Sequence, residues 1–294
     1  ELKEYEGKKG GALSAYRISE DGELSLLNQK PTNGTDPCHV TVDANSRCVM
    51  AANFMSGSIS CYPLREDGSL GETMQFFQHQ GHGKDPVRQA GPHAHSVVLT
   101  RDECYAVVPD LGMDCLMIYP TDFSNGGLRL EDRKSFFVGS GMGPRFCVFN
   151  RRGDRCYLFC EIASQIMVLR YCDGAFETIQ TCSSLVAPCE TGSIGADIHL
   201  SPDDRFLYAS NRGQDTIVSY RVADDGTLSY VQTVSTYGKT PRNFAIDRTG
   251  KWLLVGNQDS DTVTIFERDA DSGMLKRKDQ ISVPTPVCIW MGEE

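Results

Sequence analysis

The sequence has no run of about 18 apolar residues, which is the length that a membrane-spanning helix requires. Its first ten residues are charged and lack the apolar core of a secretory signal. We therefore expect no membrane partner. The chain does not begin with Met, so we also expect that it lacks an N-terminal portion.

The chain has no excess of basic residues. It contains 29 Lys and Arg against 39 Asp and Glu, a formal net charge of −10, with a sequence pI near 5.1. This balance argues against nucleic acid as a partner, because protein surfaces that bind nucleic acid are strongly basic. A small anionic substrate is compatible with it only where arginines gather locally.

The 12 cysteines include no Cys-x-x-Cys pair. Most of them lie inside apolar runs, for example Cys48, Cys115 and Cys156. This pattern favours buried thiols in a reducing compartment over a disulfide framework, and it predicts a cytoplasmic protein. Zinc sites use closely paired ligands, so no metal is expected.

The sequence also lacks Gly-x-Ser-x-Gly, a P-loop and a dinucleotide fingerprint. Nothing therefore supports a serine nucleophile, a bound nucleotide or any other cofactor. No helical periodicity is present.

What the sequence does contain is a repeat, seen most clearly between Gly91 and Tyr119. Three short apolar runs there are separated by polar turns, which is typical of antiparallel strands. The same order of runs and turns occurs in four other places. The second run of each unit ends at a recognisable residue, and these recur about every 50 positions: Asn53, Asp110, Cys160, Asn211 and Asn257.

Most units close on an Asp-Gly or Ser-Gly hairpin, as in EDGSL at 66–70 and DDGTL at 224–228. A period near 50 with four short strands per unit predicts an all-β fold, a β-propeller of four-stranded antiparallel blades. Five units are complete. The N-terminal strands and a C-terminal strand at Val287–Trp290 are expected to share a sixth blade, in a single domain over residues 1–294.

Propeller geometry predicts where polar residues gather. The start of the first strand and the end of the second lie at the same rim of an antiparallel blade, and we call these the opening and closing positions. Opening positions hold Cys38, His95, Arg145, Ala196 and Arg242. Closing positions hold the five residues named above, followed in three units by Glu161, Arg212 and Gln258. Convergent polar groups at one mouth of the channel are the expected site.

His95 is the candidate general base, because imidazole titrates near neutral pH. Arg145 and Arg212 suit a carboxylate or a phosphate, which a guanidinium binds through two hydrogen bonds. Glu161 is a candidate for orienting an Arg or a His, or for proton transfer. The alternatives are that the histidine only hydrogen-bonds a neighbouring loop, and that Glu161 pairs with an Arg to join two blades.

Further candidates for substrate contact are His93, Asn53, Asp110 and Asn257, although a strand-end amide also caps the turn of its own blade. Arg88 and Gln89 lie in the long loop before His95, a suitable place for a lid or a substrate contact. His199 lies in mid-strand, out of phase with the opening position, and is expected to be structural.

Four segments resemble the lactonase propeller family, which includes the propeller-type 6-phosphogluconolactonases and the fungal 3-carboxy-cis,cis-muconate lactonizing enzyme. They are RQAGPHAHSVVLTRD, AVVPDLGMD, ADIHLSPDDRFLYASNRGQDTIVSYRV and GKTPRNFAIDRTGKWLLVGNQDSDTVTIFERD. The resemblance covers almost the whole chain. It implies seven blades, about six of which are accounted for, and metal-independent chemistry on a lactone. It also implies that His95, Arg145, Glu161 and Arg212 are the catalytic residues.

Three functions remain open at this stage. The first is hydrolysis of a sugar lactone, such as 6-phosphogluconolactone in the pentose phosphate pathway. The second is a cycloisomerase that acts on a carboxylated muconolactone, and the third is a propeller that binds without catalysis. The expected partner is a small anionic sugar lactone or carboxylate, with the protein a monomer or weak homo-oligomer.

Overall fold

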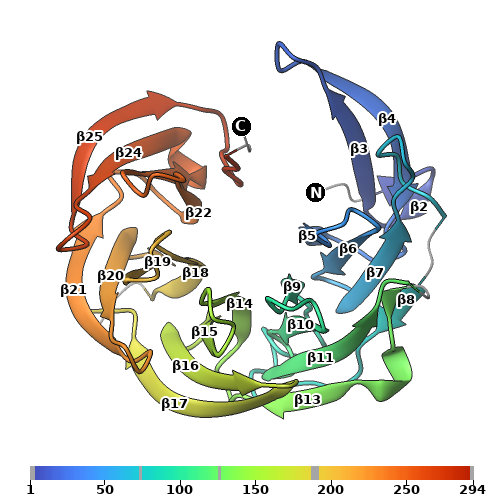
Figure 1. Cartoon of the computed structure of the whole chain (residues 1–294), viewed down its shortest axis with the longest axis horizontal. Coiled ribbons are helices and arrows are strands. Elements are labelled where there is room, and N and C mark those ends of the chain that lie inside the picture. The colour runs from blue at the N-terminus through green and yellow to red at the C-terminus, as the bar shows by residue number, and fades with distance from the viewer. Residues whose placement is uncertain (1–3, 73–74, 125–126, 187–191, 292–294) are drawn as a thin grey trace. The chain divides into compact units, whose positions relative to one another are not determined.

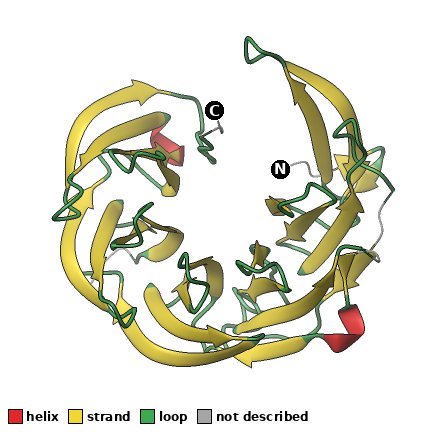
Figure 2. Cartoon of the chain, in the orientation of Figure 1, coloured by secondary structure: helices red, strands yellow, loops and turns green. Residues whose placement is uncertain are grey.

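A computed structural model describes residues 4–72, 75–124, 127–186 and 192–291. Within these ranges the regular elements are strands, apart from two short 3₁₀ helices, η1 (Leu130–Asp132) and η2 (Gln258–Ser260) (Figure 2). The runs rich in β-branched and aromatic residues form the strands, as their preference for a pleated surface predicts. The all-β class and the four-stranded antiparallel blades are confirmed.

The chain divides into two compact units. Unit 1 comprises the described residues up to 145 together with 173–175, and unit 2 comprises 146–172 and the described residues from 176 onward. Each unit has its own buried cores of apolar side chains.

Unit 1 contains two sheets of four or more strands, in which sequence neighbours pair except that β13 pairs with β11 (Figure 1). The first consists of β5 (Pro37–Val42), β6 (Cys48–Asn53), β7 (Ser58–Pro63) and β8 (Gln75–Gln78). The second consists of β9 (Val98–Leu99), β10 (Tyr105–Asp110), β11 (Cys115–Asp122), β12 (Gly127–Leu128) and β13 (Lys134–Phe137). Two hairpins precede them: β1 (Glu4–Tyr5) with β2 (Lys8–Lys9), and β3 (Ala12–Ile18) with β4 (Leu24–Pro31).

Unit 2 contains most of the sheet formed by β14 (Pro144–Phe149), β15 (Arg155–Cys160), β16 (Gln165–Cys172) and β17 (Ala175–Ser183). The next sheet is β18 (Ile194–Leu200), β19 (Phe206–Arg212), β20 (Thr216–Val222) and β21 (Leu228–Ser235). The last is β22 (Pro241–Ile246), β23 (Trp252–Asn257), β24 (Thr262–Arg268) and β25 (Leu275–Ser282). Strand order follows the sequence in all three.

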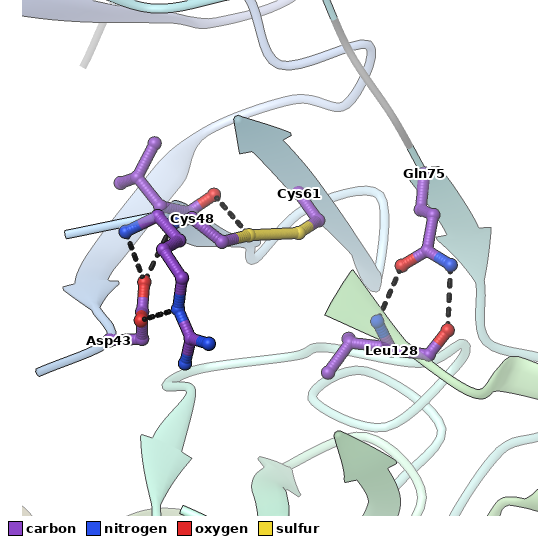
Figure 3. The surroundings of a disulfide bond; sticks show 7 residues. Asp43, Cys48, Cys61, Gln75 and Leu128 are labelled. Atoms are coloured by element: carbon purple, nitrogen blue, oxygen red, sulfur yellow. Dashed lines mark hydrogen bonds and ion pairs between the residues drawn. A yellow bond between two sulfur atoms is a disulfide. The ribbon is translucent and has the colours of Figure 1, made fainter. Parts of the chain in front are cut away.

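Neighbouring sheets are joined by a repeated contact between an outer-strand amide side chain and a leucine backbone. Gln75 Nε2 donates to Leu128 O (2.6 Å), and Leu128 N donates to Gln75 Oε1 (2.8 Å) (Figure 3). The same two-way contact recurs at other sheet junctions: Asn28 with Leu70, Gln180 with Leu228, and Gln232 with Leu275. Each contact gives the leucine N–H an acceptor and the leucine C=O a donor from the neighbouring sheet.

The structure corrects one prediction about the cysteines. A disulfide joins Cys48 of β6 to Cys61 of β7, on adjacent strands of one sheet (Figure 3). The expectation of free thiols is therefore wrong for this pair, and nine other described cysteines are free. Strand pairing brought the two side chains together, although 13 positions separate them in the sequence.

The predicted strand at Val287–Trp290 is not formed. Ile289 N donates to the side-chain Oδ1 of Asn243 (2.6 Å) and not to a strand backbone. A strand needs a ladder partner for its backbone groups, and no described segment of unit 2 pairs with this one. At the other end of the chain β3 and β4 form a two-stranded sheet.

Candidate functional site

The opening and closing positions lie at the same end of their sheets, as predicted. Pro37 pairs with Asn53, Ala94 with Asp110, and Pro241 with Asn257. In three sheets a register shift follows the pair at the closing position, which is Pro37–Asn53, Gly195–Asn211 or Pro241–Asn257. The opening residues Cys38, Ala196 and Arg242 lie inside these β-bulges. A bulge leaves its extra residue out of the ladder and redirects its side chain.

A left-handed residue followed by proline leads into several opening positions. Asp36 (φ 54°) precedes Pro37, Gly143 (φ 62°) precedes Pro144, and Thr240 (φ 57°) precedes Pro241. The positive φ turns the chain sharply, and proline then fixes its own φ in the range of an extended strand. The local sequence thus sets the direction in which Cys38, Arg145 and Arg242 leave the backbone.

In unit 1 the structure brings His93 and His95 together against one aromatic ring. The His93 ring stacks on Phe54 with centroids 4.6 Å apart, and its Nδ1 lies 2.9 Å from Phe54 O. The His95 ring meets the same phenyl group edge-on at 5.1 Å. His95 is only 8% exposed, so its orientation is fixed by packing.

Cys38 is a further neighbour of His95 that the sequence did not single out as a site residue. Its Sγ donates to His95 O (3.2 Å) and lies 3.8 Å from His95 Nδ1. Phe54 was also missed. The available signal was its position directly after Asn53, at the end of the second strand, on the rim where His93 and His95 were expected.

Arg145 is 7% exposed and follows the Gly143-Pro144 turn. Its carbonyl oxygen accepts a hydrogen bond from Ser96 Oγ (3.0 Å), the residue next to His95. The backbones that carry His95 and Arg145 are therefore linked directly within unit 1.

The long loop before His95 is held by Gln89. This side chain is fully buried: its Oε1 accepts from Lys84 N and Asp85 N, and its Nε2 donates to Leu111 O (2.8 Å) and Asp114 Oδ1 (2.7 Å). The structure gives Gln89 a structural role in place of the predicted substrate contact. Arg88 beside it is half-buried, with its backbone N–H bound to Asp85.

Asp110 also has a structural role, because both its oxygens are used inside the fold. Oδ2 lies 2.6 Å from His79 Nδ1, and Oδ1 accepts from His93 N (2.8 Å). The Tyr119 hydroxyl lies 2.9 Å from the other ring nitrogen of His79. Asp110, His79 and Tyr119 are all buried, and together they fix the backbone at His93.

Asn53 and Asn257 occupy the same closing position as Asp110 but carry a neutral amide. Asn53 Nδ2 donates to Ser58 and Ser60, and Asn257 Nδ2 donates to Thr236 O (3.2 Å) and Thr264 Oγ1 (3.0 Å). Both side chains are fully buried. They cap their own sheets, which was the alternative to the predicted substrate contact.

In unit 2 the structure pairs Glu161 with Arg212. Arg212 Nη2 lies 2.7 Å from Glu161 Oε2 and also donates to Gly195 O (2.8 Å). The carboxylate side chain is 4% exposed and the guanidinium side chain 15%. Charge-assisted pairs with this geometry are strong and orient the planar guanidinium. The sequence predicted both residues as site members and gave this pairing as one of its alternatives.

His199 is structural, as the sequence indicated. Its Nε2 lies 3.0 Å from Asp197 Oδ2, and its ring meets Phe244 edge-on. Burial alone would lower the pKa of His199, but the Asp197 carboxylate outweighs it and raises that pKa above its ordinary value.

The described residues contain no group of three or more His, Cys, Asp or Glu side chains placed to hold a metal ion. They also contain no helix that is both long and apolar enough to cross a membrane.

Comparison with known proteins gives a consistent result. Residues 3–291 match the family described as Lactonase, 7-bladed beta-propeller. A 6-phosphogluconolactonase of Bacillus subtilis is 36% identical, with 95% of this chain and 80% of that protein covered. A 6-phosphogluconolactonase of Formosa agariphila is 32% identical, with 92% and 78% covered.

Solved structures agree with this result. The periplasmic gluconolactonase of Pseudomonas aeruginosa has a TM-score of 0.88 to this chain and is 31% identical to it, with 95% of this chain and 80% of that chain covered. The similarity thus extends over nearly the whole chain in sequence and in structure.

Proposed function

The chain belongs to the lactonase seven-bladed β-propeller family, and on that premise we propose that it hydrolyses a sugar lactone, with 6-phosphogluconolactone as the substrate. The observation that carries the proposal is the setting of His95. Its ring is held edge-on to Phe54 at an opening position, next to the residue that hydrogen-bonds the Arg145 backbone. An imidazole fixed in this way is suited to general base catalysis.

The proposed reaction begins when His95 accepts a proton from water. The resulting hydroxide attacks the lactone carbonyl carbon and forms a tetrahedral oxyanion. The ring C–O bond then breaks, and the leaving oxygen takes the proton from His95, which regenerates the neutral imidazole. The product is the open-chain sugar acid, which releases its proton to solvent and becomes the carboxylate. Proton transfer by a placed base contributes roughly 10²–10⁴-fold to such a rate.

We assign Arg145 and Arg212 to the negative charges of the substrate and of the tetrahedral oxyanion. Guanidinium groups bind phosphate or carboxylate through paired hydrogen bonds and stabilise charge that develops in the transition state. Glu161, 2.7 Å from Arg212, orients that guanidinium. His93 and Arg88 remain proposed substrate contacts.

The proposal includes metal-independent hydrolysis, so activity should survive EDTA treatment. It also includes a cytoplasmic protein of carbohydrate metabolism, supported by the nine free cysteines among the described residues. We also propose that the protein is a monomer or a weak homo-oligomer and that it has no nucleic-acid or membrane partner. Cell fractionation and size-exclusion chromatography test these points separately.

A second candidate function is anion binding without catalysis. The Arg212–Glu161 pair favours it, because a guanidinium already bound to a carboxylate has less capacity for a transition-state charge. A binding protein should show a thermal shift with 6-phosphogluconate but no rate above spontaneous lactone opening.

The experiment that tests the proposed function compares wild type with His95→Ala. The lactone is generated in place and its hydrolysis is followed at saturating concentration, with the spontaneous rate subtracted. We expect His95→Ala to lower kcat by about 10²-fold or more. Equal rates for the two proteins would remove His95 from the mechanism, and no rate in wild type would refute the lactonase.

A further inference from the structure

An aspartate recurs at one position in the turn between the second and third strands. Asp114 (φ 55°), Asp215 (φ 54°) and Asp261 (φ 52°) each end this turn with a left-handed backbone. Aspartate tolerates this conformation better than most residues, because its short side chain hydrogen-bonds locally.

Each of these carboxylates accepts the same backbone N–H of the segment that leads into the next sheet. Asp114 Oδ1 accepts from Gly143 N (2.8 Å), Asp215 Oδ1 from Thr240 N (2.9 Å), and Asp261 Oδ1 from Thr285 N (2.7 Å). Gly143 lies two residues before Arg145, and Thr240 lies two residues before Arg242. Thr285 stands in the same relation to Val287.

Asp114 differs from the other two in burial and in the number of its partners. It is buried, whereas Asp261 is exposed. Its Oδ2 accepts a second backbone N–H, from Gly141 (2.7 Å), and its Oδ1 also accepts from Gln89 Nε2 (2.7 Å). One carboxylate therefore binds both the loop that leads to Arg145 and the loop that carries Arg88.

The loop that Asp114 holds has little conformational preference of its own. Gly139 (φ 119°), Gly141 (φ 77°) and Gly143 (φ 62°) all have positive φ, and each of them has many other backbone conformations open to it. Without the carboxylate the amides of Gly141 and Gly143 lose their described acceptor, and the loop loses the bonds that select this conformation.

We propose that Asp114 is a positioning residue, which sets Arg145 in place for the anionic group of the substrate. The inference rests on the proposed function, because it takes Arg145 as the residue that binds that group. Asp114 itself touches no substrate. It acts through the 139–143 loop. Through its hydrogen bond with Gln89 it also fixes the loop that carries Arg88.

The test is a double-mutant cycle on 6-phosphogluconolactone, with Asp114→Ala, Arg145→Ala and the double variant. A misplaced binding group costs about 10²-fold in rate, so we expect Asp114→Ala to lower kcat/KM about 10- to 100-fold, chiefly through KM. In the Arg145→Ala background the same change should lower kcat/KM by less than about twofold.

Asp261→Ala is the matched control, because it removes the same carboxylate-to-backbone bond ahead of Val287. We expect its kcat/KM to stay within about twofold of wild type. The hydrolysis of gluconolactone, which lacks the phosphate, gives a second readout, since the rise in KM caused by Asp114→Ala should be much smaller there, whereas a loss of oxyanion stabilisation lowers kcat on both lactones. Should Asp114→Ala not fold, Asp114→Asn carries the same cycle, because it keeps the volume and one acceptor oxygen.

The outcomes separate the inference from the function on which it rests. If Arg145→Ala leaves kcat/KM unchanged, the proposed role of Arg145 fails. If Arg145→Ala impairs hydrolysis but Asp114→Ala does not, the positioning role is overturned. An equal loss from Asp114→Ala in both backgrounds, or an equal rise in KM on both lactones, also overturns it and assigns Asp114 to general stability.

Discussion

Asp110 Oδ2 lies 2.6 Å from His79 Nδ1, and both side chains are fully buried. The corresponding closing positions of other sheets use neutral groups, as where Asn257 donates to Thr236 O. An ionisable pair at this position, Asp110 with His79, occurs next to the segment that carries His93 and His95. One Asp110 oxygen also fixes the His93 amide, so this pair anchors the segment that holds both histidines.

We predict that His79→Ala lowers the free energy of unfolding by about 3–5 kcal/mol, because it leaves the Asp110 carboxylate buried without its partner. Urea unfolding followed by circular dichroism measures the change. The double variant His79→Thr, Asp110→Asn introduces the neutral residue types of the corresponding pair, Thr236 and Asn257. It should recover most of the lost free energy of unfolding. A double variant no more stable than His79→Ala contradicts this account.

Glu161 and Arg212 give a second prediction. Glu161→Gln removes the charge but keeps the shape, so Arg212 loses its fixed orientation. We expect a rise in KM for 6-phosphogluconolactone of about tenfold, and a smaller effect of the same change in an Arg212→Ala background. Unchanged kinetics together with a lower Tm would mean that the pair only joins two sheets.

The same kinetics test whether His95 and Arg212 serve one substrate. If they do, the double variant His95→Ala, Arg212→Ala loses less kcat/KM than the product of the two single losses, because residues that act as a unit are not additive. Losses that multiply fully would place them in independent roles.

His199 gives a prediction about pH. Its folded-state pKa is raised, because the Asp197 carboxylate outweighs the effect of burial. The stabilisation is therefore fully present below about pH 6.5, the unfolded value, and is lost as pH rises through the folded pKa. We expect His199→Asn to cost more stability at pH 5.5 than at pH 9. NMR titration should show a lower His199 pKa in Asp197→Asn, and an unchanged value contradicts the stated cause.

The sequence was most informative where one physical rule decides the outcome. Asp-Gly hairpins and short apolar runs marked the four-stranded sheets, and antiparallel pairing placed Asn53, Asp110 and Asn257 beside the opening positions. The bulges at Cys38 and Arg242 were not predictable in the same way. A left-handed residue and a proline precede both of them, but the bulge at Ala196 forms without that pair, so no local signal marks all three.

Residue type proved a weaker guide to role. Gln89 and Asp110 are polar residues near the predicted rim, yet their hydrogen bonds are used within the fold. Phe54 is apolar, and it is the ring against which both histidines pack. Burial and hydrogen-bond partners decide these roles, and both depend on tertiary contacts. That residues 1–294 form a single domain, and that the site residues converge on one rim, stay predictions.

The amide-to-leucine contacts between outer strands have a consequence for how this chain tolerates mutation. In each contact the leucine supplies only its backbone N–H and C=O, as Leu128 does toward Gln75. The bond is therefore indifferent to which side chain occupies the leucine position and sensitive only to the amide opposite. The leucine side chains are themselves buried in the cores of the sheets, so a junction persists through sequence change only when an apolar residue stays at the leucine position and an Asn or Gln stays opposite it.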